Sequence, residues 1–264
     1  MTAPIRMLGI SLCLAVSLQA CGGAEEEPLP QPSPPSPEEL RAAAQAEAVR
    51  AYCGPQAVAY AGPLNTTADL TTMLNSLPRP LDVPCFVAAL PRPVAITATT
   101  SVISLQPASG RRNPRIFMQA GGGLITSITM VGEFSQHVET SEPEPNQPGF
   151  TVKGDLVFPR QEPLQEADFY SSLITPEGPS SCSGCHGGEY VAREVNGVNA
   201  FASRGLKPTR SQTVPIPDVQ ALADECTADD ATPRCRMLRA LFRDPQAILP
   251  LQFAPEILTI FGGK

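Results

Sequence analysis

Leu124-Ile125-Thr126-Ser127-Ile128-Thr129-Met130-Val131 is the stretch that decides the predicted fold of this 264-residue chain. Apolar and polar side chains alternate along it, which is the period of a β-strand with one buried face. Neighbouring stretches, bounded by Gly, Pro or polar turns, have the same strand-like character: residues 94–105, 115–119, 133–140 and 150–158. Together they predict a small antiparallel β-sandwich or sheet over residues 84–163.

Two helices are predicted before the β-rich region. Ser36-Pro37-Glu38-Glu39 offers a cap residue, a proline in the first turn and acidic side chains at the positive end of a helix dipole. A helix is therefore expected to begin there and to run to Tyr52. A second helix is predicted over residues 66–77, where apolar side chains recur on one face. Residues 38–83 are thus predicted to form a helical segment.

The chain is predicted to become helical again after Pro163. Apolar side chains at helical spacing predict helices over residues 164–174, 218–226 and 232–243. Residues 187–216 show no clear period and are predicted to be loop. The predicted fold class is α+β, with N-terminal helices, the central antiparallel sandwich or sheet, and a mainly helical, haem-bearing C-terminal segment over residues 164–264.

The first residues of the chain predict export. Residues 1–20 carry Arg6 and an apolar run too short to span a bilayer, which is typical of a signal peptide. Leu18-Gln19-Ala20-Cys21 resembles a bacterial lipobox, and the resemblance implies cleavage before Cys21 and attachment of lipid to that cysteine. The alternative is an ordinary signal peptide followed by an incidental cysteine. Residues 21–37 are rich in Pro and Glu and predict an extended linker.

These features predict a location in the bacterial cell envelope. By similarity to lipoproteins, the chain is expected at the outer membrane, facing the periplasm or the exterior. No stretch after the signal peptide approaches the ~20 apolar residues of a transmembrane helix. The lipid on Cys21 is therefore the only predicted membrane attachment.

Cys182-Ser183-Gly184-Cys185-His186 carries the clearest chemistry in the chain. Two thiols at this spacing can each bond one vinyl-derived carbon of a porphyrin, and the adjacent imidazole can then ligate the iron. The stretch resembles the haem-attachment sequence of c-type cytochromes. The resemblance implies one covalent haem c, held by Cys182 and Cys185, with His186 as the proximal iron ligand.

Other interpretations of the Cys-x-x-Cys pair are a redox pair, half of a zinc site and a short disulfide. A zinc site needs further Cys or His ligands at short spacing, and none lies nearby in the sequence. A thioredoxin-like pair is expected in a βαβ pattern, which the flanking residues lack. In the disulfide interpretation, the chain is a haem-free lipoprotein binding module whose β region holds a partner.

Two residues are candidates for the distal position of the iron. His137 is the only other histidine, and strand alternation places it with Glu139 on a polar face, which favours a solvated side chain. Met237 follows His186 by 51 residues, a spacing compatible with a cytochrome axial methionine, but its helical neighbours predict packing in the core. An empty distal position would instead suit an enzyme or a gas sensor.

The cysteine count agrees with an oxidising compartment. Cys13 leaves with the signal peptide, Cys21 takes lipid, and Cys182 and Cys185 take haem. Four cysteines remain: Cys53, Cys85, Cys226 and Cys235. An even remainder predicts two disulfides, and among three possible pairings sequence proximity favours Cys53–Cys85 and Cys226–Cys235.

The chain is acidic, with 19 basic and 26 acidic residues and a net charge of −7. This charge disfavours binding to nucleic acid or to anionic lipid surfaces. It suits a basic redox partner, whose identity the sequence does not give. No hydrolase, metalloprotease or nucleotide-binding signature occurs. We therefore expect an exported monohaem protein that carries or relays electrons, rather than an enzyme.

Overall fold

The computed structural model describes residues 33–176 and 178–259. The predicted signal peptide, Cys21 and most of the predicted linker lie outside this range. The chain divides into two units, residues 1–35 and residues 36–264, and every helix and strand named below belongs to the second unit. Within the described range, no helix is both long enough and apolar enough to cross a membrane.

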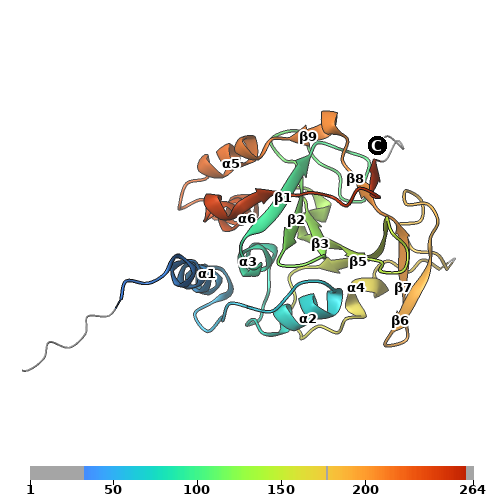
Figure 1. Cartoon of the computed structure of the whole chain (residues 1–264), viewed down its shortest axis with the longest axis horizontal. Helices are drawn as coiled ribbons and strands as arrows, with labels where there is room; N and C mark the ends of the chain where they lie inside the picture. The colour runs from blue at the N-terminus through green and yellow to red at the C-terminus, as the bar shows by residue number, and fades with distance from the viewer. Residues whose placement is uncertain (1–32, 177, 260–264) are drawn as a thin grey trace, which may run out of the picture. The chain divides into compact units, whose positions relative to one another are not determined.

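A mixed sheet of nine strands forms the centre of the second unit (Figure 1). Its strands are β1 (Val94–Thr99), β2 (Arg115–Ala120), β3 (Ile125–Ile128), β4 (His137–Pro143), β5 (Phe150–Val157), β6 (Tyr190–Val195), β7 (Val198–Arg204), β9 (Thr213–Val214) and β10 (Ile248–Pro250). The order is β10-β1-β2-β3-β4-β5-β7-β6, and β9 also pairs with β1. Only the pairing of β1 with β10 is parallel among these strands. β8 (Leu206–Lys207) and β11 (Leu258–Thr259) form a separate parallel pair.

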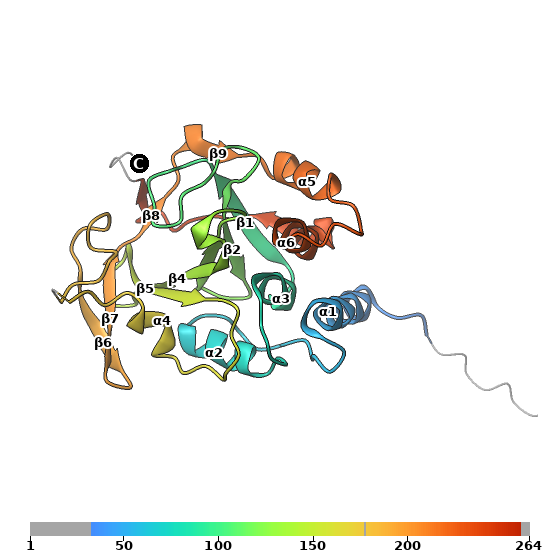
Figure 2. The same ribbon diagram turned by 180° about the vertical axis from the view of Figure 1, so that it is seen from behind.

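Helices surround this sheet. They are α1 (Pro37–Cys53), α2 (Thr67–Asn75), α3 (Val83–Ala89), α4 (Asp168–Ser171), α5 (Ile216–Asp224) and α6 (Pro233–Phe242), with 3₁₀ turns η1 (Glu133–Gln136), η2 (Arg210–Gln212) and η3 (Pro245–Ala247). In both views α3 lies beside α1 (Figure 1 and Figure 2), and it also packs against α6. The start of α1 is as predicted, because Ser36 and Glu39 form a reciprocal capping box.

The predicted fold class is wrong, because the nine-stranded sheet is mixed and continues into the C-terminal part of the chain. Residues 164–264 supply β6, β7, β9 and β10 and are not a mainly helical haem-bearing segment. The helix predicted over residues 164–174 is reduced to the four residues of α4. The helices predicted over residues 218–226 and 232–243 correspond to α5 and α6.

The missed strands β6 and β7 form a hairpin around Asn196-Gly197. Both residues have positive φ angles, 50° and 82°, as a type I′ turn requires. Val195 and Val198 flank this turn, and both strands carry further apolar side chains. An Asn-Gly pair between such runs is a strong short-range signal for a hairpin. The prediction of loop over residues 187–216 is therefore wrong, because it does not take this hairpin signal into account.

The register divides the central strands into two faces. Ile116 and Met118 of β2 and Val138 of β4 point to an apolar face and are almost completely buried. This face and the helices α1, α2, α3 and α6 share one hydrophobic core. The opposite face of the same strands carries polar and charged side chains, among them Arg115 and Glu139. The candidate site lies over this polar face.

Candidate functional site

A pocket with a cavity volume of about 290 Å³ lies over the polar face of β2 to β5. This volume is near the lower end of the range of about 300–1,000 Å³ typical of small-molecule sites. Loop residues 101–106, the Cys-x-x-Cys-His segment and residues 206–208 contribute the other walls. The floor is formed by side chains of three strands: Arg115, Phe117, His137, Glu139, Lys153 and Asp155.

Residues Cys182 to His186 form one helical turn at the wall of this pocket. The amide of Cys185 donates to the carbonyl oxygen of Cys182 at 3.2 Å, and the amide of His186 donates to the same oxygen at 3.0 Å. Residues three and four positions apart lie on one side of such a turn. Cys182, Cys185 and His186 accordingly all line the pocket, so two thiols and one imidazole face a single cavity.

Both thiols of the turn are free. The other described cysteines are paired as Cys53–Cys85, which joins α1 to α3, and Cys226–Cys235, which joins the end of α5 to α6. These are the two pairings that sequence proximity favours. Burial raises the pKa of Cys182 to about 11, and Glu139 acts in the same direction. The thiol of Cys182 is therefore neutral at physiological pH.

The ring of His186 is fixed in one tautomer by the backbone. Its Nδ1 atom lies 2.7 Å from the carbonyl oxygen of Arg204. Because a carbonyl oxygen only accepts, Nδ1 carries the proton and donates it. Burial lowers the pKa of His186 to about 4, and the charge of Lys153 acts in the same direction. The ring is therefore neutral, and its Nε2 atom has a lone pair available for a metal ion.

Ser180 and Glu189 hold the helical turn in place. The Glu189 carboxylate accepts hydrogen bonds from the amide of Ser180 at 2.7 Å and from its hydroxyl at 2.5 Å. The Ser180 hydroxyl oxygen in turn accepts from the amide of Cys182 at 3.1 Å. Ser181 donates its amide proton to the carbonyl oxygen of Leu173, just after α4. The turn is thus attached to both flanking elements, α4 and β6.

The structure brings His137 into the same pocket as His186. His137 is the first residue of β4, and residues 133–136 before it form a 3₁₀ turn instead of the predicted strand. Its side chain is on the polar face, as predicted, but that face is the floor of the pocket, and the side chain is only 22% exposed. Its Nδ1 atom lies 2.8 Å from Oδ2 of Asp155. This contact engages Nδ1, so Nε2 is the ring nitrogen that remains for a ligand in the pocket.

Met237, the other distal candidate, lies elsewhere. It is 3% exposed on α6, belongs to the hydrophobic core and does not line the pocket. Packing in the core is what its helical neighbours predict. Of the two distal candidates, only His137 shares a cavity with His186.

Sequence reasoning did not identify the charged groups of the floor. Arg115 pairs with Glu139 and lies over the ring of Phe117, 4.7 Å from its centroid. Lys153 is buried at 7% exposure, next to the hydroxyl groups of Thr151 and Ser141. These residues occupy alternate positions of predicted strands. Their meeting on one face depends on the strand register, which alternation alone does not give.

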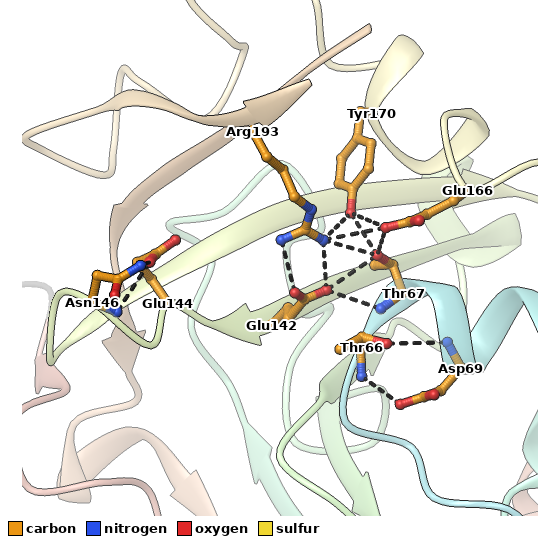
Figure 3. Close-up of polar contacts among 9 residues, drawn as sticks. All are labelled: Thr66, Thr67, Asp69, Glu142, Glu144, Asn146, Glu166, Tyr170 and Arg193. Carbon is orange, nitrogen blue, oxygen red and sulfur yellow. Dashed lines mark hydrogen bonds and ion pairs between the residues drawn. The ribbon is translucent and has the colours of Figure 1, made fainter. Parts of the chain in front are cut away.

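A second buried polar cluster connects α4 and β6, the elements that flank the Cys-x-x-Cys-His segment in the sequence (Figure 3). Arg193 of β6 forms a bidentate ion pair with Glu142 of β4, in which Nη1 lies 2.8 Å from Oε1 and Nη2 lies 2.9 Å from Oε2. The Nη2 atom of Arg193 also lies 3.3 Å from Oε1 of Glu166. The hydroxyl of Tyr170 in α4 accepts from Arg193 at 2.8 Å and lies 2.5 Å from the hydroxyl of Thr67 in α2. Burial raises the pKa of Tyr170, so its phenol stays neutral. None of the five residues lines the pocket, so the cluster positions α4 and β6.

Comparison with known proteins gives no match. No family model, curated protein or solved structure is similar to this chain. The function must therefore be inferred from the site itself, in which two free thiols and two Nδ1-anchored imidazoles line one cavity.

Proposed function

We propose that the protein is an exported, lipid-anchored carrier or relay of electrons that holds one haem c in the pocket. Cys182 and Cys185 are the attachment points, and His186 is the proximal iron ligand. The observation that carries the proposal is the helical turn, which directs both free thiols and a neutral imidazole into one cavity. Bound haem supplies reversible one-electron transfer. The chain's own residues fix the ligand and shape its surroundings.

The donor set of the pocket fits a c-type haem. A proximal histidine needs a lone pair on one ring nitrogen and an anchor on the other, and the bond from His186 Nδ1 to Arg204 provides both. Apolar side chains for contact with a porphyrin face or edge line the same cavity, including Phe117, Phe134 and Leu173. Ile103 and Leu105 extend this lining and are 44% and 47% exposed, so a porphyrin edge would remove apolar surface from water.

The size of the cavity supports a partly exposed cofactor. At about 290 Å³ it does not enclose a large ligand completely. A porphyrin attached to Cys185, whose side chain lies at the surface, keeps one edge near solvent. Such an edge suits electron exchange with a partner protein and disfavours chemistry that requires a closed, water-free site.

Absorption spectroscopy of protein produced together with a cytochrome c maturation system tests the proposal. We expect a Soret band that survives acid-acetone extraction, because the thioether bonds are covalent. The double variant Cys182→Ala/Cys185→Ala should lose the band. Cys226→Ala/Cys235→Ala is the matched control, because it removes two cysteines away from the pocket and should keep the band.

A second outcome would favour the haem-free binding module. In that case the wild-type protein is colourless under the same conditions, and mass spectrometry of the intact chain shows a Cys182–Cys185 disulfide without haem. The free state of both thiols in the structure favours haem attachment over this alternative.

A further inference from the structure

Lys153 is a buried ammonium group without a carboxylate partner. It lies on β5 at the floor of the pocket and is 7% exposed. Its Nζ atom donates to the hydroxyl of Thr151 and lies 3.5 Å from the hydroxyl oxygen of Ser141. Among residues 33–176 and 178–259, no carboxylate comes within ion-pair distance of it.

The charged neighbours of Lys153 are already engaged with other groups. Glu139 pairs with Arg115, and Asp155 is bonded to His137. Within the described residues, Lys153 therefore has no ion-pair partner on the protein side of the cavity, although buried charges in proteins are normally paired.

We infer that the floor of the pocket is a carboxylate subsite, in which Lys153 and the hydroxyl group of Ser141, both of which line the cavity, bind one carboxylate of the ligand. This inference rests on the proposed function where the carboxylate is a haem propionate. A free amphipathic carboxylic acid offers the same chemistry, because the walls around Lys153 include apolar side chains such as Ile125 and Leu173.

The composition of the subsite favours a single negative charge. Lys153 contributes one compact charge, and the hydroxyl of Ser141 contributes an uncharged polar group. Arg115 is not available as a second cation, because it pairs with Glu139 and stacks on Phe117. Lys207 lies on another wall of the pocket and does not belong to the polar cluster on the floor. A phosphate dianion would leave one charge unpaired in the cavity, whereas a carboxylate leaves none.

Lysine NMR tests the subsite directly, because the chain has only three lysines: Lys153, Lys207 and Lys264. In protein labelled with ¹³C at the lysine ε-carbon, Lys153→Met assigns the signal by its loss. Burial lowers the pKa of Lys153 to about 8 in the empty pocket. An ion pair with a carboxylate should return it to its ordinary value of about 10 or above. Lys207, on the pocket wall, is the internal control.

Three samples separate the sources of the carboxylate. They are the haem-loaded wild type, the haem-free Cys182→Ala/Cys185→Ala variant, and that variant with octanoate. A raised pKa in the loaded protein supports the subsite and identifies a propionate as its ligand. A raised pKa only with octanoate, and not with octanol, supports the subsite and assigns it to a free carboxylic acid. Lys153→Met should then weaken octanoate binding by about tenfold or more.

The test distinguishes failure of the subsite from failure of the proposed function. If the loaded protein shows its Soret band but neither haem nor octanoate raises the pKa of Lys153, the subsite is wrong and the haem assignment stands. If the pKa of Lys153 is already about 10 in the haem-free variant without octanoate, the protein itself compensates the charge of Lys153 and the inference is also wrong. A colourless wild type whose Lys153 responds to octanoate overturns only the haem assignment.

Discussion

His186 and His137 are held in the same way, each through its Nδ1 atom. A backbone carbonyl anchors His186 at 2.7 Å, and the Asp155 carboxylate anchors His137 at 2.8 Å. This arrangement leaves Nε2 as the atom free to ligate a metal, and such outer partners commonly orient metal-binding histidines. The two anchors differ in kind, because His186 contacts a backbone carbonyl and His137 contacts a side-chain carboxyl group.

At the residue scale, we predict that His137 is the distal ligand of the haem-loaded protein. The ferric wild type should be six-coordinate and low-spin. His137→Ala should convert it to a high-spin form, because the iron loses a strong-field ligand, and added imidazole should restore the low-spin spectrum. Electron paramagnetic resonance and absorption spectra measure the change. Met237→Leu, a conservative change in the core, is the control and should stay low-spin. A low-spin His137→Ala protein without added imidazole would contradict the assignment.

At the scale of elements, the cluster of Arg193, Glu142, Glu166, Tyr170 and Thr67 fastens α2, α4, β4 and β6 together (Figure 3). Arg193→Met removes its cation and leaves the carboxylate of Glu142 buried and unpaired. We expect a loss of about 3 kcal/mol in the free energy of unfolding, measured with urea. Arg111→Met is the matched control: its ion pair with Asp218 is exposed and should contribute less than about 0.5 kcal/mol. Equal effects of the two variants would disprove the structural role of the cluster.

The β6–β7 hairpin provides a second test at this scale. Gly197 has a φ of 82°, a conformation that costs an L-residue roughly 1 kcal/mol. Gly197→Ala should therefore lower the free energy of unfolding by about 1 kcal/mol. Gly187→Ala is the control, because a Cβ at residue 187 meets no atom within 4 Å and its φ is not positive. Unchanged stability of Gly197→Ala would argue against a type I′ turn at Asn196-Gly197.

Local signals in the sequence predict the elements much better than their assembly. The cap at Ser36 and the alternation around Ile125–Ile128 are properties of neighbouring residues, and the structure has a helix and a strand there. The helix expected over residues 164–174 fails because Phe169 and Tyr170 pack against β5 and β7 as one short turn. The parallel pairing of β1 with β10 joins residues about 150 positions apart in the chain, and no local period encodes such a pairing.

The candidate site also combines features that the sequence predicts with features that only the assembled fold reveals. The Cys-x-x-Cys-His spacing identified two thiols and one imidazole that the helical turn does present together. The polar face of His137 was predicted, but its burial was not, because solvent and a pocket produce the same alternation in sequence. The sequence gives no signal for Lys153, because its significance comes from the absence of an ion-pair partner within the described range.

At the scale of the whole molecule, the pocket and the predicted membrane attachment belong to different units of the chain. The pocket, both disulfides and the hydrophobic core belong to residues 36–264. Cys21 lies outside the described residues, in the other unit. Anchoring and haem attachment should therefore be independent, and a variant that removes one should keep the other.

Cys21→Ala tests this independence in the intact cell. We predict that wild-type protein sediments with the membrane fraction, because lipid on Cys21 is the proposed anchor. Stable anchoring requires more than one acyl chain or a second membrane signal, so the lipid on Cys21 is expected to carry more than one acyl chain. Cys21→Ala should move to the soluble fraction with its Soret band and its electron paramagnetic resonance spectrum unchanged. Cys13→Ala, which alters a cysteine within the predicted signal peptide, is the control and should remain with the membrane. If Cys21→Ala stays membrane-bound, the anchor is not the lipid on Cys21; if it loses its haem, the two units depend on each other for maturation.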